Sequence, residues 1–183
     1  MEHRIKPIER PKKLLAKIGF WFIKRELGKV TSVAKVIYSR FPKVMLLVKK
    51  MLDIEKKHSL SPQFQIIIQK YVAYLNGCTF CMDVSDYKAQ DLDVPRKKMT
   101  ELSTIKTSQN FSLSEKAALQ YVEELTNNVS VDDETFLNLK QQWTDNEIIE
   151  ITYCASVENF LNRLVKPLGI GDDNLCQRKE SGQ

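Results

Sequence analysis

The sequence has 183 residues, of which 43% are hydrophobic, and it carries a formal net charge of +5 at pH 7. This length is typical of one domain, and the hydrophobic content is sufficient to bury a core. Glycine and proline number only six each. With no low-complexity segment and no recurring period of about 20 to 50 residues, the composition argues against repeat proteins and long disordered linkers.

The charge is unevenly distributed along the chain. Residues 1–60 contain 16 Lys and Arg against 5 Asp and Glu, whereas the remainder contains 12 against 18. Such a basic segment can attract nucleic acid or an anionic membrane surface. We favour a solvated helix face, or one paired with the acidic part of a neighbouring subunit, and expect no nucleic-acid partner.

The beginning of the chain shows no targeting pattern. Its first residues, MEHRIKPIERPKK, are charged and lack the apolar core of a signal sequence. The longest apolar run, IGFWFI, is far shorter than the roughly 20 residues that a bilayer span needs. We therefore expect a cytoplasmic protein.

Residues 1–27 are predicted to form a basic amphipathic extension. From Pro11 to Val30 the apolar residues fall near helical spacing, with Lys and Arg between them. A basic helix that bears Trp and Phe can lie on a membrane surface. Packing on the parent domain or on a second subunit is the favoured alternative.

Helical patterns follow over the next third of the chain. Residues 31–41 and 42–58 form two of them, and Pro42 is well placed at a helix start. The pattern over 61–77 begins with Ser61 as N-cap and stops at Asn76 and Gly77. The next helix is predicted to begin at about Cys78 and to end before Pro95.

Three more helices are predicted over residues 112–125, 130–143 and 144–169. Ser112 or Ser114, then Ser130, then Thr144 precede them, each with acidic residues close behind. No alternating β-branched run of convincing length appears. The sequence therefore predicts an all-α, single-domain bundle of seven or eight helices, with 177–183 as a polar tail.

Two cysteines, Cys78 and Cys81, stand in the motif CTFC at the predicted helix start. Residues three apart share one helix face, so the two sulfurs can form a disulfide with little motion. The positive end of the helix dipole lowers the pKa of a thiol and favours the reactive thiolate. We favour a redox pair, with inert thiols and a metal site as alternatives. The remaining cysteines, Cys154 and Cys176, have 21 residues between them and no His among these, which is unlike a zinc site.

The segments LSPQFQIIIQKYVAYLNGCTFC, SLSEKAALQYVEEL and TDNEIIEITYCASVENFLNRLVKPLGIG occur in this order. Together they resemble the carboxymuconolactone decarboxylase family, in particular its alkyl hydroperoxidase D-like branch, from Gly28 to Cys176. The resemblance implies an all-helical fold for residues 28–176, a homo-oligomer (trimer or hexamer), and a site close to a subunit boundary. In peroxidase members of the family, the cysteine pair reduces a hydroperoxide and becomes a disulfide.

This chain departs from the family pattern at three polar positions. The relay Glu corresponds here to Ile66, the relay His to Ser85, and the Tyr before the second Cys to Phe80. The usual proton relay cannot operate, which implies either a slow enzyme or a replacement base. Candidates are Asp83, Asp86 and Tyr87, which lie just past the cysteine pair, and above all Glu158, which interrupts an apolar helical face.

The other polar groups near this helix have simpler interpretations. Glu158 could merely pair with Arg163 and brace the fold. Asn159 and Asn162 are expected to cap or bridge helices.

The combined hypothesis is a thiol-dependent peroxidase or disulfide reductase in antioxidant defence. Cys81 would be oxidised to a sulfenic acid and Cys78 would resolve it, provided that both sulfurs are reachable from solvent. A thiol or dithiol protein would supply electrons, and no cofactor is expected. The alternatives are a non-catalytic scaffold or binding module of the same fold, and a decarboxylase-like enzyme.

Overall fold

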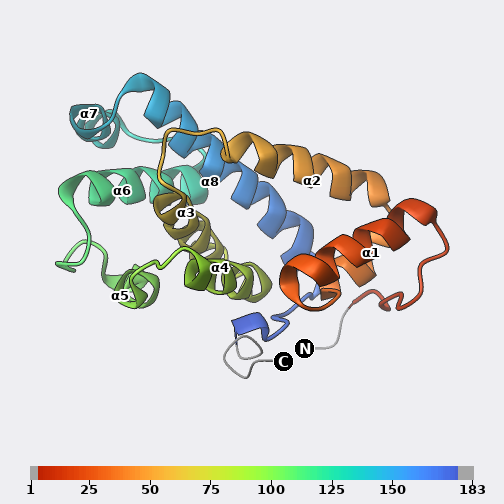
Figure 1. Ribbon diagram of the computed structural model, residues 1–183. Coiled ribbons are helices and arrows are strands. Elements are labelled where there is room, and N and C mark those ends of the chain that lie inside the picture. The colour runs from red at the N-terminus through yellow and green to blue at the C-terminus, as the bar shows by residue number, and fades with distance from the viewer. Residues whose placement is uncertain (1–3, 177–183) are drawn as a thin grey trace.

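Helix α3 (Pro62–Leu75) is the central helix of the computed structural model, which describes residues 4–176 (Figure 1). Every residue from Phe64 to Ala73 is buried, including the polar Gln65, Gln69 and Lys70. α3 packs against α4 (Thr79–Asp91), α6 (Leu113–Asn128) and α8 (Asp145–Val165). The main hydrophobic core lies among these helices.

Side-chain caps fix where several helices begin. The Ser61 hydroxyl accepts a hydrogen bond from the Phe64 backbone N–H, 3.2 Å away, at the start of α3. Ser112 begins α6 and Thr144 begins α8, each in a reciprocal capping box with the glutamate three residues on. Helix α7 (Asp133–Gln142) is capped by Asp132 rather than by the predicted Ser130.

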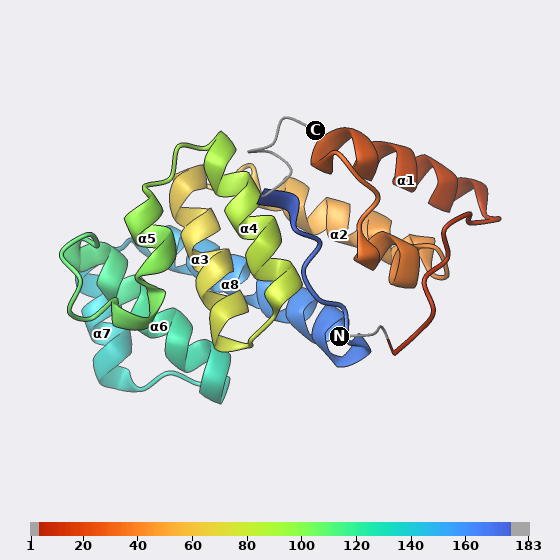
Figure 2. The ribbon, with the colours of Figure 1, turned by 90° about the horizontal axis from the view of Figure 1, so that it is seen from below.

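The N-terminal part of the chain forms a separate layer. It comprises α1 (Leu14–Leu27), the short π-helix η1 (Ala34–Tyr38) and α2 (Pro42–Glu55). Figure 2 shows α1 and α2 on one side of α3, α4 and α8, with α6 and α7 on the other. α1 approaches α2 so closely that a side chain at Gly19 would collide with Met45.

Part of α1 remains uncovered. Ala16, Gly19 and Phe20 are buried, whereas Leu14 and Trp21 are more than half exposed. Only part of the predicted apolar face of this helix is therefore buried within one chain.

The helical prediction is confirmed, with two differences. Residues 31–41 contain the π-helix rather than an α-helix, and the bond from Ser39 N–H to the Ala34 carbonyl, 2.9 Å, is its signature. A short helix α5 (Arg96–Thr100) and the 3₁₀ turn η2 (Leu102–Thr104) were not predicted. Both elements pack on the core through the buried side chains of Met99, Leu102 and Ile105. The segment is too short to show a helical period of apolar residues in the sequence.

The end of the described chain folds back over α4. The 3₁₀ turn η3 (Lys166–Leu168) follows α8 directly, and residues 169–176 continue along α4. The predicted polar tail, 177–183, lies outside the described residues. Between residues 4 and 176, none of the helices is both long enough and apolar enough to cross a membrane.

Candidate functional site

The cysteine motif lies at the sharp turn between α3 and α4. Gly77 adopts a positive φ of 62°, which a glycine accommodates without strain. A Cβ atom at this position would also stand only 3.0 Å from the Lys166 Nζ. Cys78 then acts as the N-cap of α4, and its backbone N–H donates to the Ala73 carbonyl at 2.8 Å. The turn thus places both cysteines at the helix N-terminus, as predicted.

Cys78 and Cys81 are joined in a disulfide, with their Cα atoms 5.3 Å apart. Both side chains are buried, because Cys78 is 1% exposed and Cys81 is 6% exposed. Neither sulfur lies at the surface, so the condition that both be reachable from solvent depends on a path through the interior. The last turn of α8 and η1 pack over this pair and supply the burial.

A cavity of about 820 Å³ provides access to one of the two cysteines. It lies between the N-terminal layer, α1 and α2, and the helices α3, α4 and α8. Cys81 lines it, whereas Cys78 is not among the lining residues. Exposed Lys49 and Lys56 also line the cavity, so it reaches the surface.

The three positions at which the chain departs from the family relay all line this cavity with Cys81. They are Ile66 on α3 and Phe80 and Ser85 on α4. Ser85 is 3% exposed and Ile66 is 5% exposed. Neither the isoleucine nor the phenylalanine titrates, so proton exchange in the cavity depends on other groups.

Glu158 of α8 is one of those groups. Its side chain lines the cavity, is 6% exposed, and accepts a hydrogen bond of 2.5 Å from the Asn162 Nδ2. Loss of hydration raises the pKa of this carboxyl to about 7, while the Asn162 bond and the charge of Lys88 oppose the rise. The prediction of an acid on an apolar face is confirmed, since Glu158 is buried there.

The alternative in which Glu158 pairs with Arg163 is wrong. The guanidinium of Arg163 instead donates to the backbone carbonyl and the side-chain oxygen of Asn159. Arg163 is exposed, so it extends away from the buried face on which Glu158 lies.

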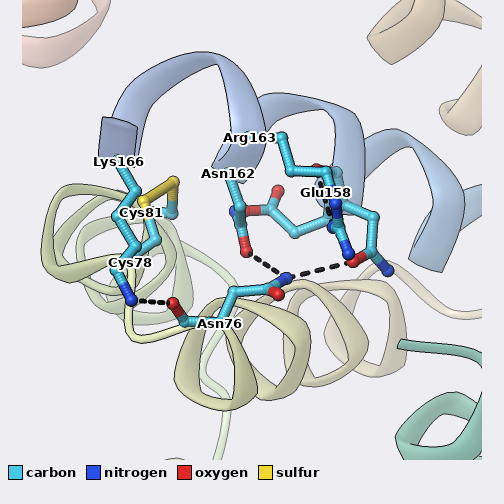
Figure 3. The surroundings of a disulfide bond; sticks show 8 residues. Asn76, Cys78, Cys81, Glu158, Asn162, Arg163 and Lys166 are labelled. Carbon is cyan, nitrogen blue, oxygen red and sulfur yellow. Dashed lines mark hydrogen bonds between the residues drawn. A yellow bond between two sulfur atoms is a disulfide. The ribbon is translucent and has the colours of Figure 1, made fainter. Parts of the chain in front are cut away.

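A chain of amide groups connects the cysteine turn with Glu158 (Figure 3). The Asn76 Nδ2 donates to Asn162 and Asn159, at 3.0 Å in each case, and the backbone carbonyl of Asn76 accepts from the Lys166 Nζ. Asn162 in turn donates to Glu158. The prediction that the two α8 asparagines bridge helices is therefore confirmed, and the bridge ends at the candidate acid.

Asp83, the other predicted site residue, has a different position. Its carboxylate accepts hydrogen bonds from the backbone N–H groups of Asp173 and Leu175, at 2.9 to 3.1 Å. It is not among the residues that line the cavity. The contacts of Asp83 are those of an anchor for the C-terminal segment.

Glu55, at the end of α2, is a site residue that sequence reasoning missed. It is 4% exposed, lines the cavity, and accepts a 2.9 Å hydrogen bond from the Gln69 Nε2 of α3. Burial raises its pKa to about 7, and its negative charge acts against ionisation of Glu158. Its position in the sequence could have revealed this burial. Glu55 follows Val48 by seven residues, or two helical turns, and so lies on the same buried face of α2.

The remaining sulfur and metal hypotheses concern residues outside the cavity. Cys154 is fully buried, its Sγ lies 3.7 Å from the Gln65 carbonyl oxygen, and burial raises the pKa of this thiol. Among residues 4–176, no group of three or more His, Cys, Asp and Glu side chains is placed to hold a metal ion.

Comparison with known proteins supports the assignment of the fold. No protein-family model matches the chain. The uncharacterized protein YnjA of Escherichia coli is 25% identical over 163 residues, which cover 87% of this chain and 89% of YnjA.

Two solved structures superpose over nearly the whole chain. A cysteine-to-alanine variant of the debrominase Bmp8, in complex with 2,3,4-tribromopyrrole, has a TM-score of 0.80 at 18% identity, covering 100% of this chain and 98% of Bmp8. The alkylhydroperoxidase AhpD core of a peroxidase-related protein from Ralstonia eutropha has a TM-score of 0.76 at 15% identity, covering 93% and 95%. This chain has the AhpD-like fold. The AhpD-like fold is the one that the sequence resemblance implied.

Proposed function

We propose that this AhpD-like chain is a thiol-dependent peroxidase of antioxidant defence, in which Cys81 reacts with a hydroperoxide. The observation that carries the proposal is the disulfide of Cys78 and Cys81 at the start of α4, with only Cys81 lining the cavity. A substrate that enters the cavity therefore meets one sulfur, while the second is held within bonding distance behind it. The likeness to the peroxidase-related protein supports the same interpretation.

The reaction proceeds in two steps. The Cys81 thiolate attacks one peroxide oxygen of ROOH, the O–O bond breaks, and a proton converts the leaving alkoxide to ROH, which leaves a sulfenic acid on Cys81. The Cys78 thiol then attacks this sulfur, so the disulfide forms and water leaves. A dithiol reductant restores both thiols by exchange and becomes a disulfide itself.

Glu158 is the group that we assign to proton transfer in the first step. It lines the cavity with Cys81, and its pKa of about 7 lets it both accept and release a proton near neutral pH. Glu55 is the other buried acid among the residues that line the cavity. Asp83 is the weaker candidate, because backbone amides occupy its oxygens.

The test is a thiol titration of the fully reduced chain before and after one equivalent of cumene hydroperoxide. The proposal predicts the loss of two thiols per wild-type chain and no disulfide in Cys78→Ser or Cys81→Ser. Cys154→Ser is the matched control, because its buried thiol lies outside the cavity, and it must behave as wild type. If the wild-type chain keeps all its thiols, the non-catalytic scaffold is the better description.

Reductive dehalogenation is a second candidate, favoured by the size of the cavity and by the likeness to Bmp8 with its bound tribromopyrrole. In that reaction an aryl bromide and two thiols would give the arene, hydrogen bromide and the disulfide. Bromide release from 2,3,4-tribromopyrrole by the reduced chain measures it directly. Release that matches disulfide formation one to one, without comparable peroxide turnover, would favour this second function.

A further inference from the structure

The walls of the cavity are mostly apolar. They come from α1 and α2 on one side and from α4 and α8 on the other, and they include Leu15, Phe22, Met45, Leu52, Val84 and Leu161. The cavity volume, about 820 Å³, falls within the range of about 300–1,000 Å³ that is typical of small-molecule sites. Hydrogen peroxide would fill a small part of such a space. The walls therefore suit a carbon-rich molecule.

Among the polar side chains that also line the cavity, Glu55 has an oxygen without a partner. Within the described residues, the Glu55 Oε1 is a buried oxygen without a hydrogen-bond partner, while its twin Oε2 accepts from Gln69. The side chain is more than nine-tenths buried and lines the cavity. A buried acceptor that lacks a donor costs roughly 1–3 kcal/mol. A bound molecule with an O–H or N–H group would supply the missing donor.

The position of this oxygen determines how a ligand would lie. Glu55 and Cys81 line the same cavity, one from α2 and the other from α4. A donor on the ligand that reaches Glu55 leaves the carbon skeleton among the apolar walls. The head group then lies near Lys88, which also lines the cavity and whose charge acts on Glu55.

We infer that the cavity is a binding site for carbon-rich molecules with a single O–H or N–H donor, which Glu55 accepts. This inference deepens the proposed function and rests on it only in taking Cys81 as the reacting atom. It extends the substrate class from simple peroxides to bulky organic compounds whose head group bonds to Glu55.

The test compares two ligands of nearly equal shape, 2-naphthol and 2-methylnaphthalene, of which only the first has a donor. Binding to the full-length chain in its disulfide form is measured by naphthalene fluorescence and calorimetry at pH 8. At this pH the Glu55 carboxyl, with a pKa of about 7, is largely ionised and accepts well. We expect 2-naphthol to bind about tenfold more tightly, although the methyl compound is the more hydrophobic.

The variant Glu55→Met removes both acceptor oxygens at similar volume. It should bind 2-methylnaphthalene at least as tightly as wild type and lose the preference for 2-naphthol. Asp53→Asn is the matched control, because Asp53 lines the exposed part of the cavity, and it should keep the preference. If Glu55→Met does not fold, Glu55→Gln replaces it, since its one remaining acceptor can serve Gln69.

Equal binding of the two ligands, no binding of either, or a preference that survives in the Glu55 variant overturns the inference. The binding measurement uses no peroxide and no reduced thiol. A chain that binds 2-naphthol through Glu55 but keeps its thiols in hydroperoxide would thus refute the peroxidase while leaving the ligand site intact. The reverse pattern would refute only the ligand site.

Discussion

At the residue scale, Glu158 is the group that we propose for proton transfer at Cys81. A carboxyl that is removed from water keeps its proton to higher pH than one on the surface. The groups that act on Glu158 come from three helices: Asn162 on its own helix, Lys88 on α4 and Glu55 on α2. Since their effects oppose one another, the pKa settles at about 7, where the carboxyl can exchange protons in both directions.

The Glu158→Gln substitution should slow oxidation of Cys81 by cumene hydroperoxide by about 10²-fold, because an amide cannot exchange the proton. Wild type should speed up as pH rises through about 7, because the ionised carboxylate takes the proton of the Cys81 thiol before it passes that proton to the leaving alkoxide, and the variant should lack this step. Stopped-flow measurements on the reduced proteins between pH 6 and 8 would show both effects. Glu134→Gln, an exposed change on α7, is the control and should leave the profile unaltered. A variant with the wild-type profile would exclude Glu158 from the relay.

The same carboxyl should make stability depend on pH. Its pKa rises from 4.5 in the unfolded chain to about 7 in the fold, so the native state binds the proton more tightly. The resulting stabilisation is complete below pH 4.5 and is lost as pH rises through 7. Urea unfolding should therefore find Glu158→Gln more stable than wild type by roughly 2 kcal/mol at pH 8.5, with a smaller difference at pH 5. A difference that is equal at both pH values would contradict this pKa.

At the scale of elements, most helices were predictable from an apolar period in the sequence, and α3, α6, α7 and α8 also begin at a capping side chain. The turn from α3 to α4 was predictable for the same reason, since Asn76 and Gly77 mark a helix end. The burial of the cysteines was not, because it depends on α8 and η1, which are distant in sequence. Glu55 was missed since it stands in a charged run, and only the packing of α2 against α3 makes it a buried acid.

Helix α4 is tied to the C-terminal segment through Asp83. Replacing Asp83 with Ala removes the acceptor of two buried backbone donors and should lower the free energy of unfolding by about 1–3 kcal/mol. Thiol loss in hydroperoxide should stay at two per chain. Urea unfolding and the thiol titration measure these two quantities. A variant that keeps wild-type stability but oxidises about 10²-fold more slowly would restore Asp83 as a relay candidate.

At the scale of the whole molecule, the N-terminal layer has an uncovered apolar face. Trp21 on α1 and Leu47 and Ile54 on α2 are 48–58% exposed and do not line the cavity. Such exposed apolar side chains on neighbouring helices are typical of protein interfaces. We propose that this face joins copies of the chain, in line with the predicted homo-oligomer.

A charge placed in this face should separate the copies. Leu47→Asp is expected to reduce the molar mass measured by light scattering from that of an oligomer toward 21.2 kDa, because an ionised side chain is costly to bury. Leu137→Asp, an exposed position on α7, is the matched control and should leave the mass unchanged. A wild-type chain that already elutes at the mass of one copy would contradict the proposal.

The most direct test of the proposed mechanism concerns which sulfur meets the peroxide. The reduced Cys78→Ser variant, which lacks the resolving thiol, is treated with one equivalent of cumene hydroperoxide in the presence of dimedone and analysed by peptide mass spectrometry. The mechanism predicts a dimedone adduct on Cys81, the cysteine that lines the cavity, and none in the corresponding Cys81→Ser variant. An adduct on Cys78 in Cys81→Ser, with Cys81 unmodified in Cys78→Ser, would contradict it.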